Sequence, residues 1–134
     1  MIVIDCSALV HGLTDRGPRG DAVRAKIAAH GLAAPALLDF EVGSALFGMA
    51  RGQRGGVPKL AAEDLDEALA TYQALTIRRY DAMPFWPRVR ELSANLSAYD
   101  AAYVALAEGL DVDFVTSDAR IAKAGVARVT VDVL

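Results

Sequence analysis

Four acidic residues stand where a carboxylate could do chemistry. Asp5 ends the apolar run Met1–Ile4, and Asp118 ends the run DFVTSD, so both are expected at the carboxyl end of a strand. Asp100 opens an alanine-rich stretch, and Glu41 lies in a stretch of helical periodicity. Carboxylate oxygens suit Mg²⁺ or Mn²⁺, which proteins bind through a few carboxylates and which keep several waters.

Each aspartate also has a purely structural explanation. Asp5 and Asp118 could cap the helices that follow them, because an aspartate accepts hydrogen bonds from the free N–H groups of a helix start. Ser97 and Asp100 form the S-x-x-D pattern of a capping box, which needs no further role. Taken one at a time, these three residues do not establish a site.

Glu41 is harder to explain in structural terms. It shares a helical face with Leu38, Ala45 and Met49, where an unpaired carboxylate is costly to bury. A buried salt bridge to an arginine is the alternative to a metal. Two carboxylates about 4 Å apart repel by about 4 kcal/mol at an effective dielectric constant near 20, so a cluster of acids needs a cation. Neither paired cysteines nor a His-x-x-x-His spacing is present, which argues against zinc.

Strands that alternate with helices must position these acids. The pattern predicts a mostly parallel sheet with right-handed crossovers and helices on both faces. In such a sheet the site lies beyond the carboxyl ends of the strands, near a switch in strand order. We expect strands within 1–4, 76–83, 113–118 and 126–134, helices over 36–49, 61–75, 84–96, 97–110 (ending near Gly109) and 119–125, and an exposed loop from Arg51 to Lys59.

The composition suits a single domain over residues 1–134. The chain is 54% hydrophobic and 23% charged, and its formal charge of −3 gives no basic surface for nucleic acid. A bound metal would reverse the local sign of an acidic site, so RNA is not excluded. Cys6 is the one cysteine, and no leader or membrane-spanning stretch is seen, which favours the cytoplasm.

The order of these motifs resembles the PIN domain family, and more narrowly the VapC toxins of bacterial toxin–antitoxin pairs. The segments that carry the resemblance are VIDCSAL, LLDFEVGSAL, and LSAYDAAYVALAEGL leading into DFVTSDARI, which together cover essentially the whole chain. The resemblance implies a three-layer α/β/α sandwich with a mostly parallel sheet of about five strands. It also implies a metal-dependent endoribonuclease in which Asp5, Glu41, Asp100 and Asp118 hold Mg²⁺ or Mn²⁺ and the hydroxyls of Ser7 and Thr116 support them.

The same resemblance implies partners and products. The expected products carry a 5′-phosphate and a 3′-hydroxyl, and the expected partners are a VapB-like antitoxin near helix 36–49 and a second copy of the chain. Ser44 departs from the family, which often has asparagine three residues after the helix glutamate. Arg51, Arg54 and Lys59 could bind an RNA backbone, although an ordinary solvated loop explains them equally well.

Two other protein classes share parts of this pattern. A receiver domain or phosphotransfer enzyme would phosphorylate Asp5, but receivers usually have an acidic pair on the first strand, and the D-x-D of related enzymes is broken by Ser7. A non-catalytic interaction module of the same fold is the second alternative, and the presence of all four acids argues against it.

Trp86, between two prolines, is expected to anchor an edge of the core.

Overall fold

The computed structural model describes residues 1–52 and 56–134, so Arg54 lies outside the described residues. Five strands in these ranges form one sheet in the order β3-β2-β1-β4-β5, and every neighbouring pair is parallel. The expected parallel sheet is therefore confirmed. The strands are β1 (Ile2–Ile4), β2 (Leu32–Pro35), β3 (Ile77–Tyr80), β4 (Phe114–Thr116) and β5 (Val131–Val133).

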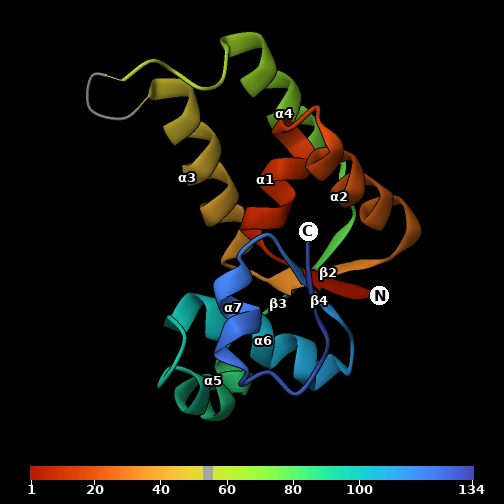
Figure 1. Ribbon diagram of the computed structural model, residues 1–134, viewed down its shortest axis with the longest axis vertical. Helices are drawn as coiled ribbons and strands as arrows, with labels where there is room; N and C mark the ends of the chain where they lie inside the picture. Colours follow the sequence, from red (N-terminus) through yellow and green to blue (C-terminus); the bar gives the residue numbers. More distant parts are fainter. Residues whose placement is uncertain (53–55) are drawn as a thin grey trace.

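Helices cover both faces of this sheet, which confirms the three-layer arrangement. Figure 1 shows α1 to α4 on one side of the sheet and α5 and α6 on the other. None of the helices in the described ranges is long and apolar enough to cross a bilayer. The helices are α1 (Cys6–Thr14), α2 (Pro18–Ala29), α3 (Leu38–Arg51), α4 (Ala62–Ala74), the short 3₁₀ helix η1 (Met83–Phe85), α5 (Trp86–Leu92), α6 (Ala98–Leu110) and α7 (Ala119–Ala124).

The central strands β1 and β4 are buried because they are apolar on both faces. From β1 the chain crosses to β2 and β3 on one side, and it later returns to add β4 and β5 on the other side. Strand order therefore reverses between β1 and β4. The carboxyl ends of these two strands carry Asp5 and, just beyond Thr116, Asp118, as the switch-point argument expects.

Some local expectations were wrong. The buried residues of α3 are Leu38, Val42 and Leu46, and not Ala45 and Met49. Because the buried face of α3 is rotated relative to the expected one, Glu41 lies at the side of the helix, half-buried and outside the core. Trp86 does not anchor the core edge, because 58% of its surface is exposed.

The end of α6 also differs from the expectation. The helix runs to Leu110 and stops at Asp111, which takes the left-handed conformation with φ of 53°. Gly109 lies inside the helix, where a Cβ would come within 2.5 Å of the ring of Phe85. The glycine therefore serves the packing of η1 against α6. Residues 6–35, which form α1, α2 and β2, carried no definite prediction beyond a turn or short helix at Cys6.

Candidate active site

Asp5 is the most deeply buried acid of the candidate site. Its side chain is only 5% exposed. Oδ1 accepts hydrogen bonds from the hydroxyl of Ser7 at 2.7 Å and from the backbone N–H of Ala8 at 2.9 Å, so Asp5 caps α1. Oδ2 accepts a hydrogen bond from the hydroxyl of Thr116 at 2.5 Å. Asp5 is thus a helix cap, as its structural explanation requires, and it also stands at the sheet edge where chemistry is expected.

Ser7 and Thr116 tie the ends of β1 and β4 together. Their hydroxyl oxygens are 3.2 Å apart, and both contact Asp5. The backbone N–H of Ser117 donates to Ser7 Oγ at 2.9 Å, and that of Asp118 donates to Thr116 Oγ1 at 3.0 Å. The two hydroxyls therefore fix the Asp5 carboxylate and the start of the loop that carries Asp118.

Glu41 faces the same region from α3. Its Oε1 accepts a hydrogen bond of 2.6 Å from the phenol of Tyr103, which is buried in α6. The salt-bridge alternative is not found, since the hydrogen-bond partner of Glu41 within the described ranges is this neutral phenol. Burial raises the pKa of Glu41, and the negative charges of Asp5 and Asp100 raise it further, while the hydrogen bond from Tyr103 lowers it.

Asp100 lies in the first turn of α6. Ser97 caps this helix, and its hydroxyl accepts a hydrogen bond of 3.1 Å from the backbone N–H of Asp100. The capping box is therefore half formed, because the Asp100 carboxylate itself accepts no hydrogen bond from the described residues. That carboxylate is close enough to raise the pKa of both Asp5 and Glu41 by its charge.

Asp118 differs from the other three acids because it has a cationic partner. It caps α7 by accepting from the backbone N–H of Arg120 at 3.0 Å. The Arg120 guanidinium donates to both carboxylate oxygens, with its shortest contact at 2.6 Å, and lowers the pKa of Asp118. The Arg120 side chain is 87% exposed, so solvent competes for this ion pair.

Burial and neighbouring negative charge disfavour the ionised forms of the two more buried acids, Asp5 and Glu41. Burial is the main cause that raises the pKa of Asp5, with a smaller contribution from the charge of Asp100. Burial and the charges of Glu41 and Asp5 also raise the pKa of the Cys6 thiol to about 12. A neutral thiol beside carboxylates is neither a nucleophile nor a soft metal ligand at neutral pH.

The donor set fits a hard divalent cation. Its atoms are carboxylate and hydroxyl oxygens, with no ionised thiol among them. The described side chains do not by themselves converge into a group of three or more potential metal ligands. Asp118 is held on Arg120 and would have to release it to approach a common centre, whereas Glu41 can keep its Oε1 bond to Tyr103 and present its other carboxylate oxygen.

Asp5 does not suit an aspartyl-phosphate role. Both of its carboxylate oxygens are engaged in hydrogen bonds, and the side chain is almost fully buried. A phosphorylated carboxyl oxygen loses its charge and would give up these hydrogen bonds, whereas an ionised oxygen that accepts one hydrogen bond keeps a lone pair for a cation. The geometry therefore counts against the receiver-domain alternative.

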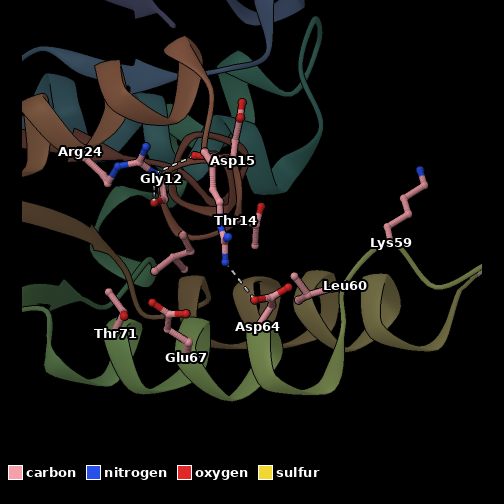
Figure 2. Close-up of a pocket in the computed structure, with 11 residues that line it drawn as sticks. Gly12, Thr14, Asp15, Arg24, Lys59, Leu60, Asp64, Glu67 and Thr71 are labelled. Carbon is pink, nitrogen blue, oxygen red and sulfur yellow. Dashed lines mark hydrogen bonds and ion pairs between the residues drawn. The ribbon is translucent and has the colours of Figure 1, made fainter.

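A separate hollow of about 360 Å³ lies between the α1–α2 connection and α4, and none of the four acids lines it (Figure 2). The Arg24 guanidinium donates there to the backbone carbonyls of Gly12 and Asp15, and Arg16 pairs with Asp64. The Arg24 guanidinium is thus satisfied by carbonyl oxygens and Arg16 by a carboxylate of the protein itself. The side chains of this hollow therefore serve to hold α1, α2 and α4 together.

Two of the loop cations predicted to bind RNA, Arg51 and Lys59, are not beside the acids. Lys59 lines the hollow of Figure 2, and Arg51 is the last residue of α3. Ten residues separate Arg51 from Glu41, which is about 15 Å along a helix axis. Arg54, the third of these cations, lies outside the described ranges. A role for Arg51 and Lys59 in RNA binding stays a prediction, and it concerns RNA that extends beyond the acids.

Sequence reasoning missed three side chains that contact the candidate site. Tyr103 lies three residues after Asp100 on α6, a spacing that places both on one side of a helix, so periodicity could have indicated it. Arg120 lies two residues after Asp118. His11, taken as an isolated residue, is 2.9 Å from the hydroxyl of Ser117, and burial lowers its pKa. No local signal pointed to that contact.

The chain was then compared with known proteins. Residues 2–127 match the family model described as PIN domain. Over 134 residues the chain is 40% identical to Ribonuclease VapC9 of Mycobacterium tuberculosis, and the alignment covers 100% of this chain and 98% of that protein.

Solved structures share the fold. PAE2754 from Pyrobaculum aerophilum superposes with a TM-score of 0.65 at 25% identity, over 98% of this chain and 90% of that one. VapBC2 from Rickettsia felis, crystallised with a DNA fragment from its promoter, gives a TM-score of 0.66 over 100% and 99% of the two chains. At 12% identity the second comparison shows the fold alone.

Proposed function

Because the chain belongs to the PIN domain family, and its relatives include VapC ribonucleases, we propose that it is a metal-dependent endoribonuclease toxin that hydrolyses phosphodiester bonds in RNA. The observation that carries the proposal is the set of partners of Asp5 and Glu41. In the described ranges their carboxylates are bonded by hydroxyls and one backbone N–H, all neutral donors. Acids with raised pKa values and no cationic partner are suited to hold a divalent cation.

We propose that Asp5, Glu41, Asp100 and Asp118 hold Mg²⁺ or Mn²⁺. Ser7 and Thr116 orient Asp5, and Tyr103 orients Glu41, so these three residues position ligands without being ligands. Asp118 would become a ligand once its carboxylate releases Arg120 and binds the ion instead. When bound, the ion supplies positive charge at the scissile phosphate and makes a nearby water more acidic.

The side chains would then divide the work of hydrolysis. A water oxygen forms a bond to phosphorus, and its proton passes to Asp100 or Asp118. The bond from phosphorus to the 3′ oxygen breaks, and that oxygen takes back the proton held by the carboxyl group and leaves as a 3′-hydroxyl, while the 5′ side keeps the phosphate. Once the Arg120 guanidinium has left Asp118, it is placed to bind the scissile phosphate, because a guanidinium can donate two hydrogen bonds to phosphate oxygens.

The same proposal includes partners and location. A VapB-like antitoxin would cover the acids and contact α3, and a second copy of the chain would form a homodimer. Exposed apolar side chains support such contacts, among them Met83 and Trp86. We place the toxin in the cytoplasm, where RNA is abundant and the single Cys6 stays reduced.

Cleavage of total cellular RNA tests the proposal. Purified chain, free of partners, should release discrete fragments in Mg²⁺ or Mn²⁺ and none in a chelator. Asp100→Asn should abolish cleavage and keep the fold, because the Asp100 side chain caps no helix. An absence of cleavage together with an absence of Mn²⁺ binding by calorimetry would contradict the proposal, and the non-catalytic interaction module would then stand.

A further inference from the structure

A groove adjoins the candidate active site on one side. It has a volume of about 600 Å³ and is lined by Cys6, Leu37, Phe40, Glu41, Ser44, Ala45 and Tyr99. It lies between α3 and the first turn of α6, over the start of α1. Glu41 belongs both to the groove and to the acids, so the two are continuous.

Two aromatic side chains of the groove are unusually exposed. Phe40 is 83% exposed and Tyr99 is 65% exposed. Each is the chain neighbour of a site acid, Phe40 of Glu41 and Tyr99 of Asp100. The fold therefore places an aromatic ring beside each of two acids that would hold the metal. Core packing does not explain these rings, because both expose most of their surface to solvent.

The remaining lining residues narrow the chemistry of the occupant. Glu41 is the one charged residue among them, and no lining side chain is a cation that would bind a phosphate. Leu37 and Ala45 are apolar, while Ser44 and Tyr99 offer hydroxyls. Such a lining accepts a flat, uncharged, partly polar group, and a nucleobase is such a group.

We propose that this groove binds the base of a nucleotide that flanks the scissile phosphate, with Phe40 and Tyr99 as the stacking residues; the inference rests on the proposed ribonuclease function. A base is joined to its phosphate through one sugar, so a base flanking the cleaved bond must lie within one nucleotide of the acids. Stacking of a base on an aromatic ring tolerates all four bases. The groove then holds single-stranded RNA in place and leaves sequence selection to other contacts.

Kinetics with a mapped RNA oligonucleotide test the stacking residues. Phe40→Ala and Tyr99→Ala should each raise KM by about 5- to 150-fold, the range expected for loss of one base–aromatic stack, with a smaller change in kcat. Phe40→Tyr and Tyr99→Phe should keep KM near the wild-type value. Phe47→Ala is the matched control, because Phe47 is an exposed phenylalanine of α3 that does not line this groove.

Crosslinking gives a readout that does not depend on cleavage. A random-sequence RNA pool carrying 5-iodouracil, bound in a chelator and irradiated, should form adducts on Phe40 or Tyr99 that peptide mass spectrometry can locate. Adducts confined to other aromatic residues, or none while the RNA is bound, would overturn the groove assignment. Alanine variants that leave KM unchanged but weaken inhibition by an antitoxin would also overturn it and assign the groove to a protein partner.

Failure of the ribonuclease function and failure of the groove assignment give different experimental results. A wild-type chain that neither binds nor cleaves RNA would remove the ribonuclease function and the groove assignment together. A chain that cleaves RNA equally well with and without the two aromatic rings would leave the ribonuclease function intact and overturn the groove assignment alone.

Discussion

The phenol of Tyr103 donates a hydrogen bond of 2.6 Å to Oε1 of Glu41 and thereby joins α6 to α3 across the candidate site. The phenol stays protonated, because burial and the charge of Glu41 raise the pKa of Tyr103. One carboxylate oxygen of Glu41 is fixed by this bond. The other is left available for a cation.

Removal of that hydroxyl should weaken metal binding. We expect Tyr103→Phe to lower Mn²⁺ affinity by about 10- to 100-fold, because a ligand that loses its supporting hydrogen bond is less well oriented. Calorimetric titration measures the change. Tyr72→Phe is the control, since it removes a phenol–carboxylate bond of the same 2.6 Å length, to Asp39, outside the site. Equal Mn²⁺ affinity in the two variants would refute a positioning role for Tyr103.

Glu41 should make the metal-free protein less stable as pH rises. Its pKa is raised on folding, so the folded chain keeps a proton that the unfolded chain releases. Stability is therefore fully present below the unfolded pKa and is lost as pH rises through the folded pKa. Glu41→Gln, melted in a chelator between about pH 5 and about pH 8, should unfold at a higher temperature than wild type near neutral pH.

Asp39 is a control for this pH experiment, because folding lowers its pKa where it raises that of Glu41. Hydrogen bonds from Arg79 lower the pKa of Asp39, so its contribution is present above the unfolded pKa and is lost as pH falls through the folded value. Asp39→Asn should therefore lower the melting temperature near neutral pH. If the melting temperatures of Glu41→Gln and wild type change with pH in the same way, ionisation of Glu41 does not destabilise the folded protein.

Cys6 can report on the charge of the acids. Burial, then the charges of Glu41 and Asp5, raise the thiol pKa to about 12. A divalent cation would cancel the contribution of the two carboxylates, and the thiolate fraction would rise. We expect iodoacetamide to modify Cys6 faster with Mn²⁺ than with a chelator, followed by mass spectrometry. The acceleration should be smaller in Glu41→Gln, and its absence in both proteins would mean that no cation binds near Cys6.

Arg120 competes with a metal for Asp118. Because the ion pair is exposed, its loss should change the free energy of unfolding little. Arg120→Ala should tighten Mn²⁺ binding by no more than about 5-fold, because an exposed pair competes weakly with a cation. Lys123→Ala, which removes an exposed cation from the same helix, should leave the affinity unchanged. Weaker binding in Arg120→Ala would show that the arginine supports the site and does not block it.

Gly20 should not tolerate a side chain. A Cβ at this buried position in α2 would lie 1.8 Å from the carbonyl oxygen of Asp15, so the α1–α2 connection would have to move. We expect Gly20→Ala to lower the free energy of unfolding by about 1–3 kcal/mol or more. Gly48→Ala in α3 meets no atom within 4 Å and should raise it by about 0.5–1 kcal/mol. Chemical denaturation of both variants decides the comparison.

The sequence indicated the acids because each breaks a local pattern. Asp5 and Asp118 end apolar strands, and Glu41 interrupts a helical periodicity, so a short window of sequence is enough to notice them. The parallel sheet and its three layers followed from the alternation of strands and helices, and the structure confirms both. That Asp5 and Asp118 are helix caps was also foreseen, since the same chemistry favours aspartate at helix starts.

Other features depend on contacts between distant residues. β2 has the sequence LAAP, with no β-branched residue, and becomes a strand because it pairs with β1 on one side and β3 on the other. The bond between Tyr103 and Glu41 spans 62 positions, and that between Asp5 and Thr116 spans 111. Periodicity within one segment carries no information about such pairs, so the packing of the whole chain decides them.

Asp5 is a helix cap and also a proposed metal ligand, so the two roles are lost together. On the proposed function, a substitution at Asp5 should give an inactive chain that is also less stable. Asp100 contributes only its backbone N–H to the cap of α6, so a substitution there should give an inactive chain that still folds. A folded, inactive chain would still bind the antitoxin and would compete with the active chain for it, whereas an unstable Asp5 variant would not.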